Sequence, residues 1–378
     1  MSTFARSLAL LSLVSGAALG CGSDSGGSPA APSGGSSLGG ESAAAGSSNE
    51  GGAGAGGSSG GSTSTGAAGQ GGAGASGAGS GGSAGSASSG ASGAGGDAAG
   101  AAGAGGAAGS DGGFWGPGGP KKQYTCPSGP LPAQSLGPAL TVCEGFDYAY
   151  NYVEGPTWIA GEGAFFFSNF PIGQYTGGDI IKFTPGEGCE VWLPNVGCNG
   201  LGVSPSGNLL AACQGPRAVM EYDVQTKQAR TIASMAGGKM LDSPNDLIAR
   251  SDGNVYFSNR TAELGNRPKG LGEALVRIDP LGATSVIQMG ALNGLALSPD
   301  ELKLHVVTMG TWTLDATGTP GAKGGPAPSG DGIAVDCAGN ITNNGTNSAF
   351  GGPDLKTLFI VGPDTETHTR AATVPGLP

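Results

Sequence analysis

The chain has 378 residues, of which 79 are glycine and only 12% are charged, and its formal net charge is −11. The glycines follow no G-X-Y period, which excludes a collagen-like protein, and the acidic balance argues against a nucleic-acid partner. With two histidines in the whole chain, His305 and His368, the sequence excludes a zinc site built from several histidines and argues against a histidine-dependent catalytic triad.

Residues 1–20 are typical of a secretion signal, because Arg6 precedes an apolar stretch that is too short to span a bilayer. The stretch ends in Ala-Leu-Gly-Cys, and this ending resembles the signal of bacterial lipoproteins. The resemblance implies export, cleavage before Cys21 and lipidation of its thiol. Gly22 in place of an aspartate favours anchoring to the outer membrane, on the periplasmic or the cell-surface side. The alternative is a plain signal peptide that ends in a cysteine by chance.

Residues 21–119 are rich in glycine, serine and alanine, and after Cys21 they contain five acidic residues and no lysine or arginine. Such a segment cannot bury enough apolar surface to offset the entropy of ordering, so we expect a disordered tether. A lead-in with two cysteines follows over residues 120–148. The remaining residues, 149–378, are enough for one large domain.

Six cysteines follow Cys21, at Cys126, Cys143, Cys189, Cys198, Cys213 and Cys337. An even number in an exported domain predicts three disulfides, and no C-x₂-C pair indicates a zinc site. Cys126 with Cys143 is the favoured pair because both flank a Pro/Gly-rich loop. Cys189 with Cys198 is a second candidate, although the sequence leaves about fifteen combinations open.

One sequence unit recurs along the domain: a polar residue opens an apolar strand, a turn follows, and a second apolar strand comes next. The opening residues are Glu154, Asn199, Asn245, Asn293, Asp331 and Asn347. They lie 45, 46, 48, 38 and 16 residues apart, and repeats of about 40–48 residues with four strands are typical of propeller blades. We therefore predict an all-β, six-bladed propeller; the alternative, a β-sandwich, would not repeat the unit.

The last spacing is too short for a complete blade. Roughly two strands are missing after Ile341, so we expect one shortened blade. The sequence does not decide whether this blade is truncated or bypassed through residues 342–347.

The first strand of each propeller blade lines the central channel, so the six opening residues should meet at one mouth. All six carry a side-chain oxygen, and two are carboxylates. This donor set suits Ca²⁺, with Mn²⁺, Mg²⁺ or Zn²⁺ as possible substitutes. Each Asn-Gly or Asp-Gly pair could instead mark a turn, but a turn does not account for Glu154.

Five segments at blade spacing carry a resemblance to a known family. They are EGPTW from Glu154, SPNDL from Ser243 with SDGNVYF from Ser251, NGLALSPD from Asn293, DGIAVD from Asp331 and FGGPDLKTL from Phe350. Across residues 150–362 the chain resembles the SMP-30/gluconolactonase/LRE-like family. The resemblance implies a six-bladed propeller with one catalytic divalent ion on Glu154, Asn293 and Asp331, and with Asn245 as fourth ligand or substrate contact.

The resemblance also implies hydrolysis of a lactone or a related ester. In that hypothesis the ion polarises the carbonyl, and Asp331 accepts a proton from water or attacks directly. Asn199, Asn245 and Arg260 are the expected substrate contacts, and the protein would be a monomer with a small-molecule substrate and no membrane contact beyond its lipid anchor. The sequence departs from the family where Ser258-Asn259-Arg260 replaces Thr-Asp-Pro, and after Ile341. The alternative is a non-catalytic surface propeller that carries a structural Ca²⁺ and binds carbohydrate or protein.

Overall fold

The computed structural model describes residues 113–116, 119–173 and 177–378. The predicted signal peptide, Cys21 and nearly all of the predicted tether therefore lie outside the described residues. Within that part the only helical element is one 3₁₀ turn, η1 (Ala262–Leu264), and no helix there is long and apolar enough to cross a membrane. The prediction of an all-β fold is confirmed.

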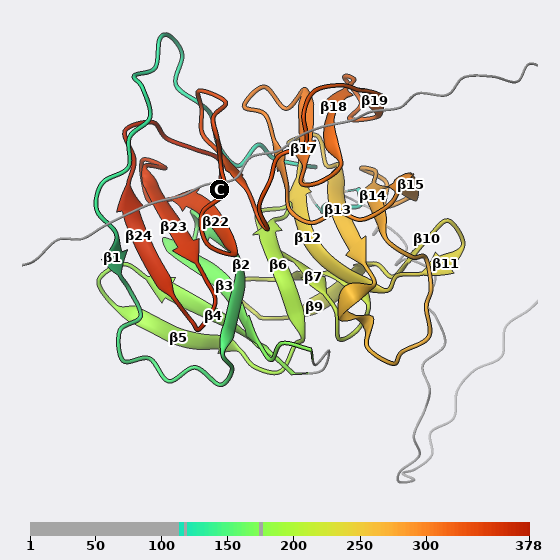
Figure 1. Cartoon of the computed structure of the whole chain (residues 1–378), viewed down its shortest axis with the longest axis horizontal. Coiled ribbons are helices and arrows are strands. Elements are labelled where there is room, and N and C mark those ends of the chain that lie inside the picture. Colours follow the sequence, from blue (N-terminus) through green and yellow to red (C-terminus); the bar gives the residue numbers. More distant parts are fainter. Residues whose placement is uncertain (1–112, 117–118, 174–176) are drawn as a thin grey trace, which may run out of the picture. The chain divides into compact units, whose positions relative to one another are not determined.

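Five four-stranded antiparallel sheets form propeller blades (Figure 1). The first blade contains β2 (Tyr152–Ile159), β3 (Ala164–Phe170), β4 (Asp179–Thr184) and β5 (Gly188–Leu193). The second contains β6 (Cys198–Val203), β7 (Leu209–Cys213), β8 (Ala218–Tyr222) and β9 (Ala229–Ala233). The third contains β12 (Ser243–Ala249), β13 (Val255–Arg260), β14 (Ala274–Ile278) and β15 (Thr284–Met289). The fourth contains β16 (Leu295–Leu297), β17 (Lys303–Val306), β18 (Gly310–Leu314) and β19 (Pro320–Lys323).

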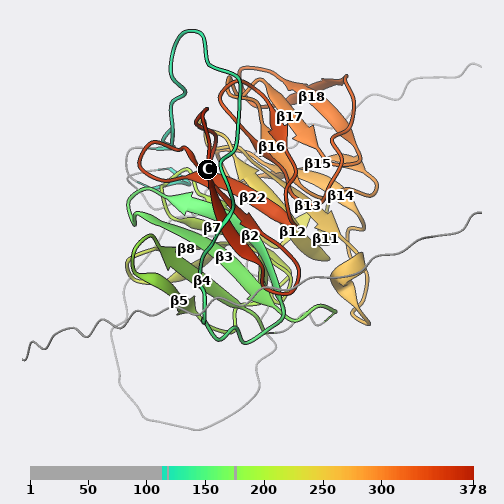
Figure 2. The same ribbon diagram turned by 60° about the vertical axis from the view of Figure 1, so that its left-hand side comes forward.

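The last blade contains β22 (Asn347–Gly351), β23 (Thr357–Val361), β24 (Thr367–Ala371) and β1 (Leu140–Thr141). A short hairpin of β10 (Met235–Ala236) and β11 (Lys239–Met240) joins the second blade to the third. The first strands of neighbouring blades contact one another around the centre, and β22 lies beside β2, which closes the ring (Figure 2).

Six complete blades do not form. Where the fifth repeat unit was predicted, β20 (Ala334–Val335) and β21 (Ile341–Thr342) make only a two-stranded ribbon. The repeat is truncated because residues 343–346 lead directly from β21 to β22, which leaves no chain for two outer strands.

The residues after β24 complete the hydrogen bonding of this ribbon. The Leu377 N–H donates to the Val335 carbonyl at 2.9 Å, and the Cys337 N–H donates to the Pro375 carbonyl at 2.8 Å. The Phe350 N–H in β22 donates to the Leu377 carbonyl at 3.3 Å, so this segment runs between β20 and β22. Leu377 is buried with Val335, and the gap beside the short ribbon is therefore filled by the last residues of the chain.

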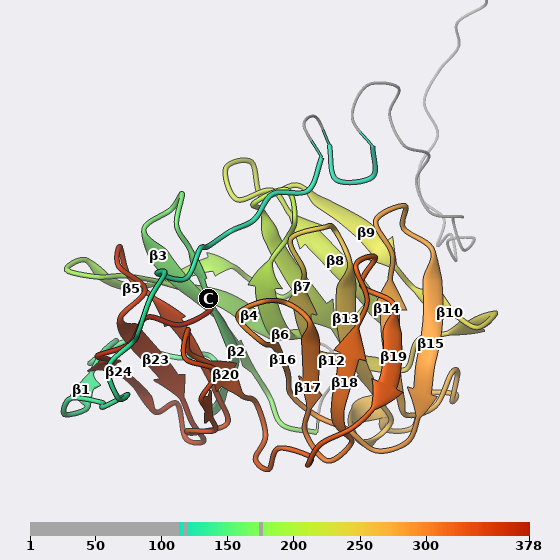
Figure 3. The same ribbon diagram turned by 90° about the horizontal axis from the view of Figure 1, so that it is seen from above.

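The lead-in crosses the turns that follow the first strands, at the far end of those strands from Asn199 and Asn245. The Lys121 N–H donates to the Pro205 carbonyl at 2.8 Å, and the indole N–H of Trp115 donates to the Gly253 carbonyl at 2.8 Å. Figure 3 shows this segment running across the blades toward β1. Trp115 is buried against the third blade, so contact with the propeller begins within the stretch predicted as tether.

The six cysteines form three disulfides, as predicted, but with different partners. The pairs are Cys126–Cys337, Cys143–Cys189 and Cys198–Cys213. The predicted pairs Cys126–Cys143 and Cys189–Cys198 are wrong, because they matched cysteines that are close in sequence. The two lead-in cysteines instead reach Cys189 in β5 and Cys337 in the turn between β20 and β21, and Cys198 and Cys213 are direct partners in the β6–β7 ladder.

Apolar side chains pack between neighbouring blades. Phe165 and Phe167 of β3 lie with their ring centres 4.7 and 5.4 Å from that of Phe359 in β23. Burial of such large rings on both sides of the junction stabilises the closure between the first and last blades.

Candidate functional site

The six opening residues lie at or just before the first strands, as the repeat predicted. Glu154, Asn199 and Asn245 lie in β2, β6 and β12, and they line one pocket together with Asp331, which precedes β20. Asn293 does not line this pocket, but its side-chain amide donates a hydrogen bond to the Asp331 carboxylate. The structure therefore brings the four predicted metal ligands (Glu154, Asn245, Asn293 and Asp331) to one mouth of the channel.

Asn347 is directed elsewhere. Its amide donates to both carboxylate oxygens of Asp246, at 3.1 and 3.3 Å. Asn347 and Asp246 line a second, smaller space deeper in the channel. The sixth opening residue therefore supports a carboxylate in the channel rather than lining the pocket.

Local irregularities in the first strands aim the opening residues into the channel. The ladder register shifts between Glu154 and Thr157 in β2, with equivalent shifts between 198 and 201 in β6 and between 244 and 247 in β12. A β-bulge of this kind bends its strand and redirects a side chain. The same feature in three consecutive blades directs three side chains toward a common point.

The glycines after the opening residues allow neighbouring strands to approach closely. A Cβ on Gly200 would lie 2.5 Å from the Asn245 carbonyl oxygen, and one on Gly294 would lie 2.5 Å from the Asp331 carbonyl oxygen. The Asn-Gly pairs, for which a simple turn was the alternative, therefore mark contacts between blades. In the third repeat this position is Asp246, which places an additional carboxylate in the channel.

The pocket is small and has one aromatic side. It encloses about 160 Å³, which suits a small molecule rather than a polymer. The rings of Tyr152 and Phe170 meet edge to face, with centres 5.4 Å apart. The other lining residues are Glu154, Pro171, Ile172, Gly173, Asn199, Gln214, Asn245, Arg260, Glu263 and Asp331.

Arg260, a predicted substrate contact, lines the pocket as expected. Its Nε lies 3.3 Å from Oε1 of Glu263, which follows it on η1. Burial raises the pKa of Glu263, and the nearby Arg260 guanidinium opposes that shift. The pair fixes a guanidinium in the pocket wall.

Three carboxyl groups in the channel, those of Glu154, Asp246 and Asp331, have raised pKa values. Burial raises the pKa of Glu154 well above its ordinary range, and the charges of Asp246 and Asp331 raise it further. Burial and the charge of Asp331 raise the pKa of Asp246 to about 7, although the hydrogen bonds from Asn347 oppose this. Burial also raises the pKa of Asp331, against the effects of Arg260 and Asn293. Concentrated buried negative charge of this kind favours a cation.

The donor chemistry fits a hard divalent cation. In the described ranges, there is no cluster of three or more His, Cys, Asp or Glu side chains placed to hold a metal ion. The predicted ligand set has only two carboxylates, and its other two donors are asparagine amides. The Oδ1 of Asn293 is nevertheless buried and has no hydrogen-bond partner, beside the Asp331 carboxylate. An unpaired carbonyl oxygen next to buried carboxylates is the kind of group that Ca²⁺ accepts.

The departure at Ser258-Asn259-Arg260 leaves the pocket wall intact. Asn259 is fully buried, accepts the Asp242 N–H at 2.8 Å, and donates to the Gly272 carbonyl at 2.6 Å. Ser258 accepts the Asp246 N–H at 2.9 Å. Asn259 therefore anchors the strand end, and only Arg260 faces the pocket.

Sequence reasoning missed several pocket residues, namely Tyr152, Phe170, Gln214 and Glu263, and it also missed Asp246 in the channel. A signal existed for Asp246, because it stands where four of the repeats have glycine. No comparable signal marked the other four, which depend on how strand ends meet in space.

The raised pKa values predict an inverse pH dependence of stability without metal. In the folded state these carboxyls hold protons that the unfolded chain releases near pH 4, so the free energy of unfolding should fall as pH rises from about 4 to about 7. Denaturant midpoints measured in chelator across this range would show the fall. Saturating Ca²⁺ should remove it, and Asp246→Asn should reduce it. A metal-free midpoint that rises with pH would contradict this electrostatic description.

A family model and a curated relative indicate the same protein family. A family model described as SMP-30/Gluconolactonase/LRE-like region matches residues 152–344. A gluconolactonase of Zymomonas mobilis subsp. mobilis is 30% identical over 265 residues, which cover 60% of this chain and 70% of that protein.

Two solved structures share the fold. A protein provisionally described as a gluconolactonase has a TM-score of 0.54 at 24% identity, covering 66% of this chain and 96% of its own. A Xanthomonas campestris gluconolactonase has a TM-score of 0.52 at 22% identity, covering 64% of this chain and 99% of its own.

Proposed function

Because the chain belongs to the SMP-30/gluconolactonase/LRE-like family, we propose that it is a metal-dependent hydrolase that opens a lactone or a related ester. The observation that carries this proposal is the convergence of buried carboxylates from separate repeats on a small pocket. Glu154 and Asp331 line that pocket, and Asp246 lies directly behind it.

The proposed ion is Ca²⁺, held by Glu154, Asn293 and Asp331, with Asn245 as fourth ligand or substrate contact. Hard oxygen donors in an irregular arrangement favour Ca²⁺ over Mg²⁺, Mn²⁺ or Zn²⁺. When bound, such an ion supplies the Lewis acidity that polarises an ester carbonyl.

Side chains of the pocket would transfer the proton and bind the substrate. Asp331 takes the proton of the attacking water as a general base. The amide of Asn293 orients that carboxylate. Arg260 and the amides of Asn199 and Asn245 bind substrate oxygens. Tyr152 and Phe170 pack against the substrate ring and exclude water from one side.

The test uses the whole chain with Cys21→Ala, which cannot be lipidated there, after removal of bound metal. Hydrolysis of glucono-δ-lactone or δ-valerolactone above the buffer rate should require added divalent ion and should saturate at one ion per chain. Asp315→Asn, a change of an exposed acid outside the pocket, should hydrolyse normally. Metal-independent hydrolysis would contradict the proposed site.

One observation favours the non-catalytic alternative, a surface propeller with a structural ion. Asp331, the proposed base, precedes a two-stranded ribbon rather than a complete blade. If the chain binds one Ca²⁺ but hydrolyses no lactone, this alternative becomes the better description, and binding to carbohydrate or protein should then be examined.

We further propose that Cys21 carries a lipid that anchors a monomeric domain at the outer membrane. The sequence at residues 1–22 supports this proposal. Labelled palmitate should be incorporated into the native chain and not into Cys21→Ala, which should leave the membrane fraction. Equal labelling of both would overturn the proposal.

A further inference from the structure

The second strands of the first three blades end in the same way at the pocket. In the strand ladders Val153 faces Asn169, Cys198 faces Cys213, and Pro244 faces Asn259. Asn169, Cys213 and Asn259 are therefore equivalent positions. The residue that follows each one lines the pocket: Phe170, Gln214 and Arg260.

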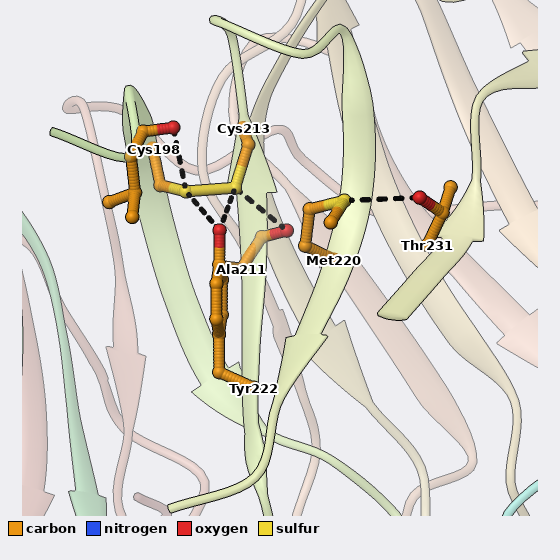
Figure 4. Close-up of a disulfide and its surroundings, with 7 residues drawn as sticks. Cys198, Ala211, Cys213, Met220, Tyr222 and Thr231 are labelled. Atoms are coloured by element: carbon orange, nitrogen blue, oxygen red, sulfur yellow. Dashed lines mark hydrogen bonds between the residues drawn. A yellow bond between two sulfur atoms is a disulfide. The ribbon is translucent and has the colours of Figure 1, made fainter. Parts of the chain in front are cut away.

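Two of these strand ends are anchored by asparagine. Asn169 donates to the carbonyls of Tyr150 and Tyr152 at 2.8 and 2.9 Å. Asn259 bonds to the backbone just before β12, at Asp242, and just before β14, at Gly272. In the second blade the Cys198–Cys213 disulfide takes this place (Figure 4). The Tyr222 hydroxyl lies 3.6 and 3.9 Å from its two sulfurs. A covalent link thus fixes the strand end from which Gln214 enters the pocket.

The backbone after the disulfide is also held. The Arg267 guanidinium donates to the Gln214 carbonyl at 2.8 Å, and the Gly215 N–H donates to the Gly197 carbonyl at 2.9 Å. The side chain of Gln214 is only 4% exposed, yet its Nε2 has no hydrogen-bond partner. An unpaired buried donor destabilises the fold, so its presence at a fixed pocket position calls for a ligand.

We propose that Gln214 is a specificity-determining residue that donates a hydrogen bond from Nε2 to a substrate oxygen away from the bond that is cleaved. This inference rests on the proposed lactonase function and deepens it. The preferred substrate carries a ring hydroxyl or a second carbonyl, because a simple aliphatic lactone would leave the Gln214 donor unpaired.

The test compares Gln214→Met with the parent chain on glucono-δ-lactone and on δ-valerolactone, which lacks the hydroxyls. The value of kcat/KM should fall about tenfold for the hydroxylated lactone and stay within about twofold for the other. The metal-free Tm should not fall, because the change removes an unpaired buried donor. Gln214→Leu, which also lacks the donor, should lose activity in the same selective way, and the exposed Gln228→Met should change nothing.

Equal losses on both lactones, or a lowered Tm with unchanged selectivity, would show a structural role and overturn the inference. If the parent chain hydrolyses neither lactone, the proposed function fails separately. Calorimetry with glucono-δ-lactam, which keeps the hydroxyls, then decides about Gln214. Binding that weakens about tenfold in Gln214→Met supports the inference, and no binding or equal binding overturns it.

Discussion

Replacing Glu154 with glutamine is expected to weaken Ca²⁺ binding by more than about 100-fold, since losing even an outer partner of a metal ligand costs 10–100-fold. Glu154 is 5% exposed and lines the pocket, and glutamine keeps its shape while removing its charge. Calorimetric titration of the metal-stripped chain would measure the loss. Metal-dependent lactone hydrolysis should disappear with it.

The same substitution should stabilise the metal-free protein. The Glu154 carboxylate is buried and lies in the field of Asp246 and Asp331, and a neutral replacement removes both the cost of burying its charge and that repulsion. The midpoint of unfolding at neutral pH should therefore rise in chelator, while the stabilisation by added Ca²⁺ should vanish. A variant that binds Ca²⁺ as the parent does would place the ion elsewhere. Asp315→Asn serves as the matched control because that acid is exposed.

Asp331→Asn should lower kcat by roughly 10²–10⁴-fold at saturating metal, the usual contribution of a positioned general base. Asparagine fills the same space and can still contact Asn293, but it accepts no proton. In the parent chain kcat/KM should rise with pH as Asp331 loses its proton, and this limb should be absent in the variant.

Metal affinity must be measured beside the rate, because Asp331 is also a proposed ligand. If the variant binds Ca²⁺ weakly but regains full kcat when saturated, Asp331 is a ligand and not the base. Direct attack by the carboxylate predicts a covalent ester on Asp331, which mass spectrometry of quenched reactions would detect. Full activity without saturation would exclude Asp331 from both roles.

The blade repeat could be predicted from the sequence because the first strands of most blades begin with the same two kinds of residue. A residue with a side-chain oxygen opens the strand, and a residue without a side chain lets the next blade approach, as Gly200 and Gly294 do. From that pattern alone, Glu154, Asn199 and Asn245 are predicted to meet at one mouth of the channel, and all three line the pocket. It also predicted a shortened repeat after Ile341, although not the ribbon of β20 and β21 that replaces a blade.

The disulfide partners and the outer pocket wall were not visible, because both depend on contacts between segments far apart in sequence. Cys126 reaches Cys337 only because the lead-in crosses the propeller. Phe170 and Gln214 line the pocket only because of the strand register. A one-residue slip in pairing would point both side chains away from the pocket. The sequence showed that Asn259 departs from the family pattern, but only the structure shows that its side chain anchors a strand end.

The Cys126–Cys337 bond has a mechanical consequence. It joins two residues with a sequence separation of 211, and every residue that lines the pocket, from Tyr152 to Asp331, lies inside the covalent loop so formed. Tension applied between the two ends of the described chain passes from residue 126 directly to residue 337 through the sulfur atoms. The backbone that forms the pocket therefore does not carry this tension. A force that detaches the segments before residue 126 and after residue 337 does not extend the chain between the two cysteines.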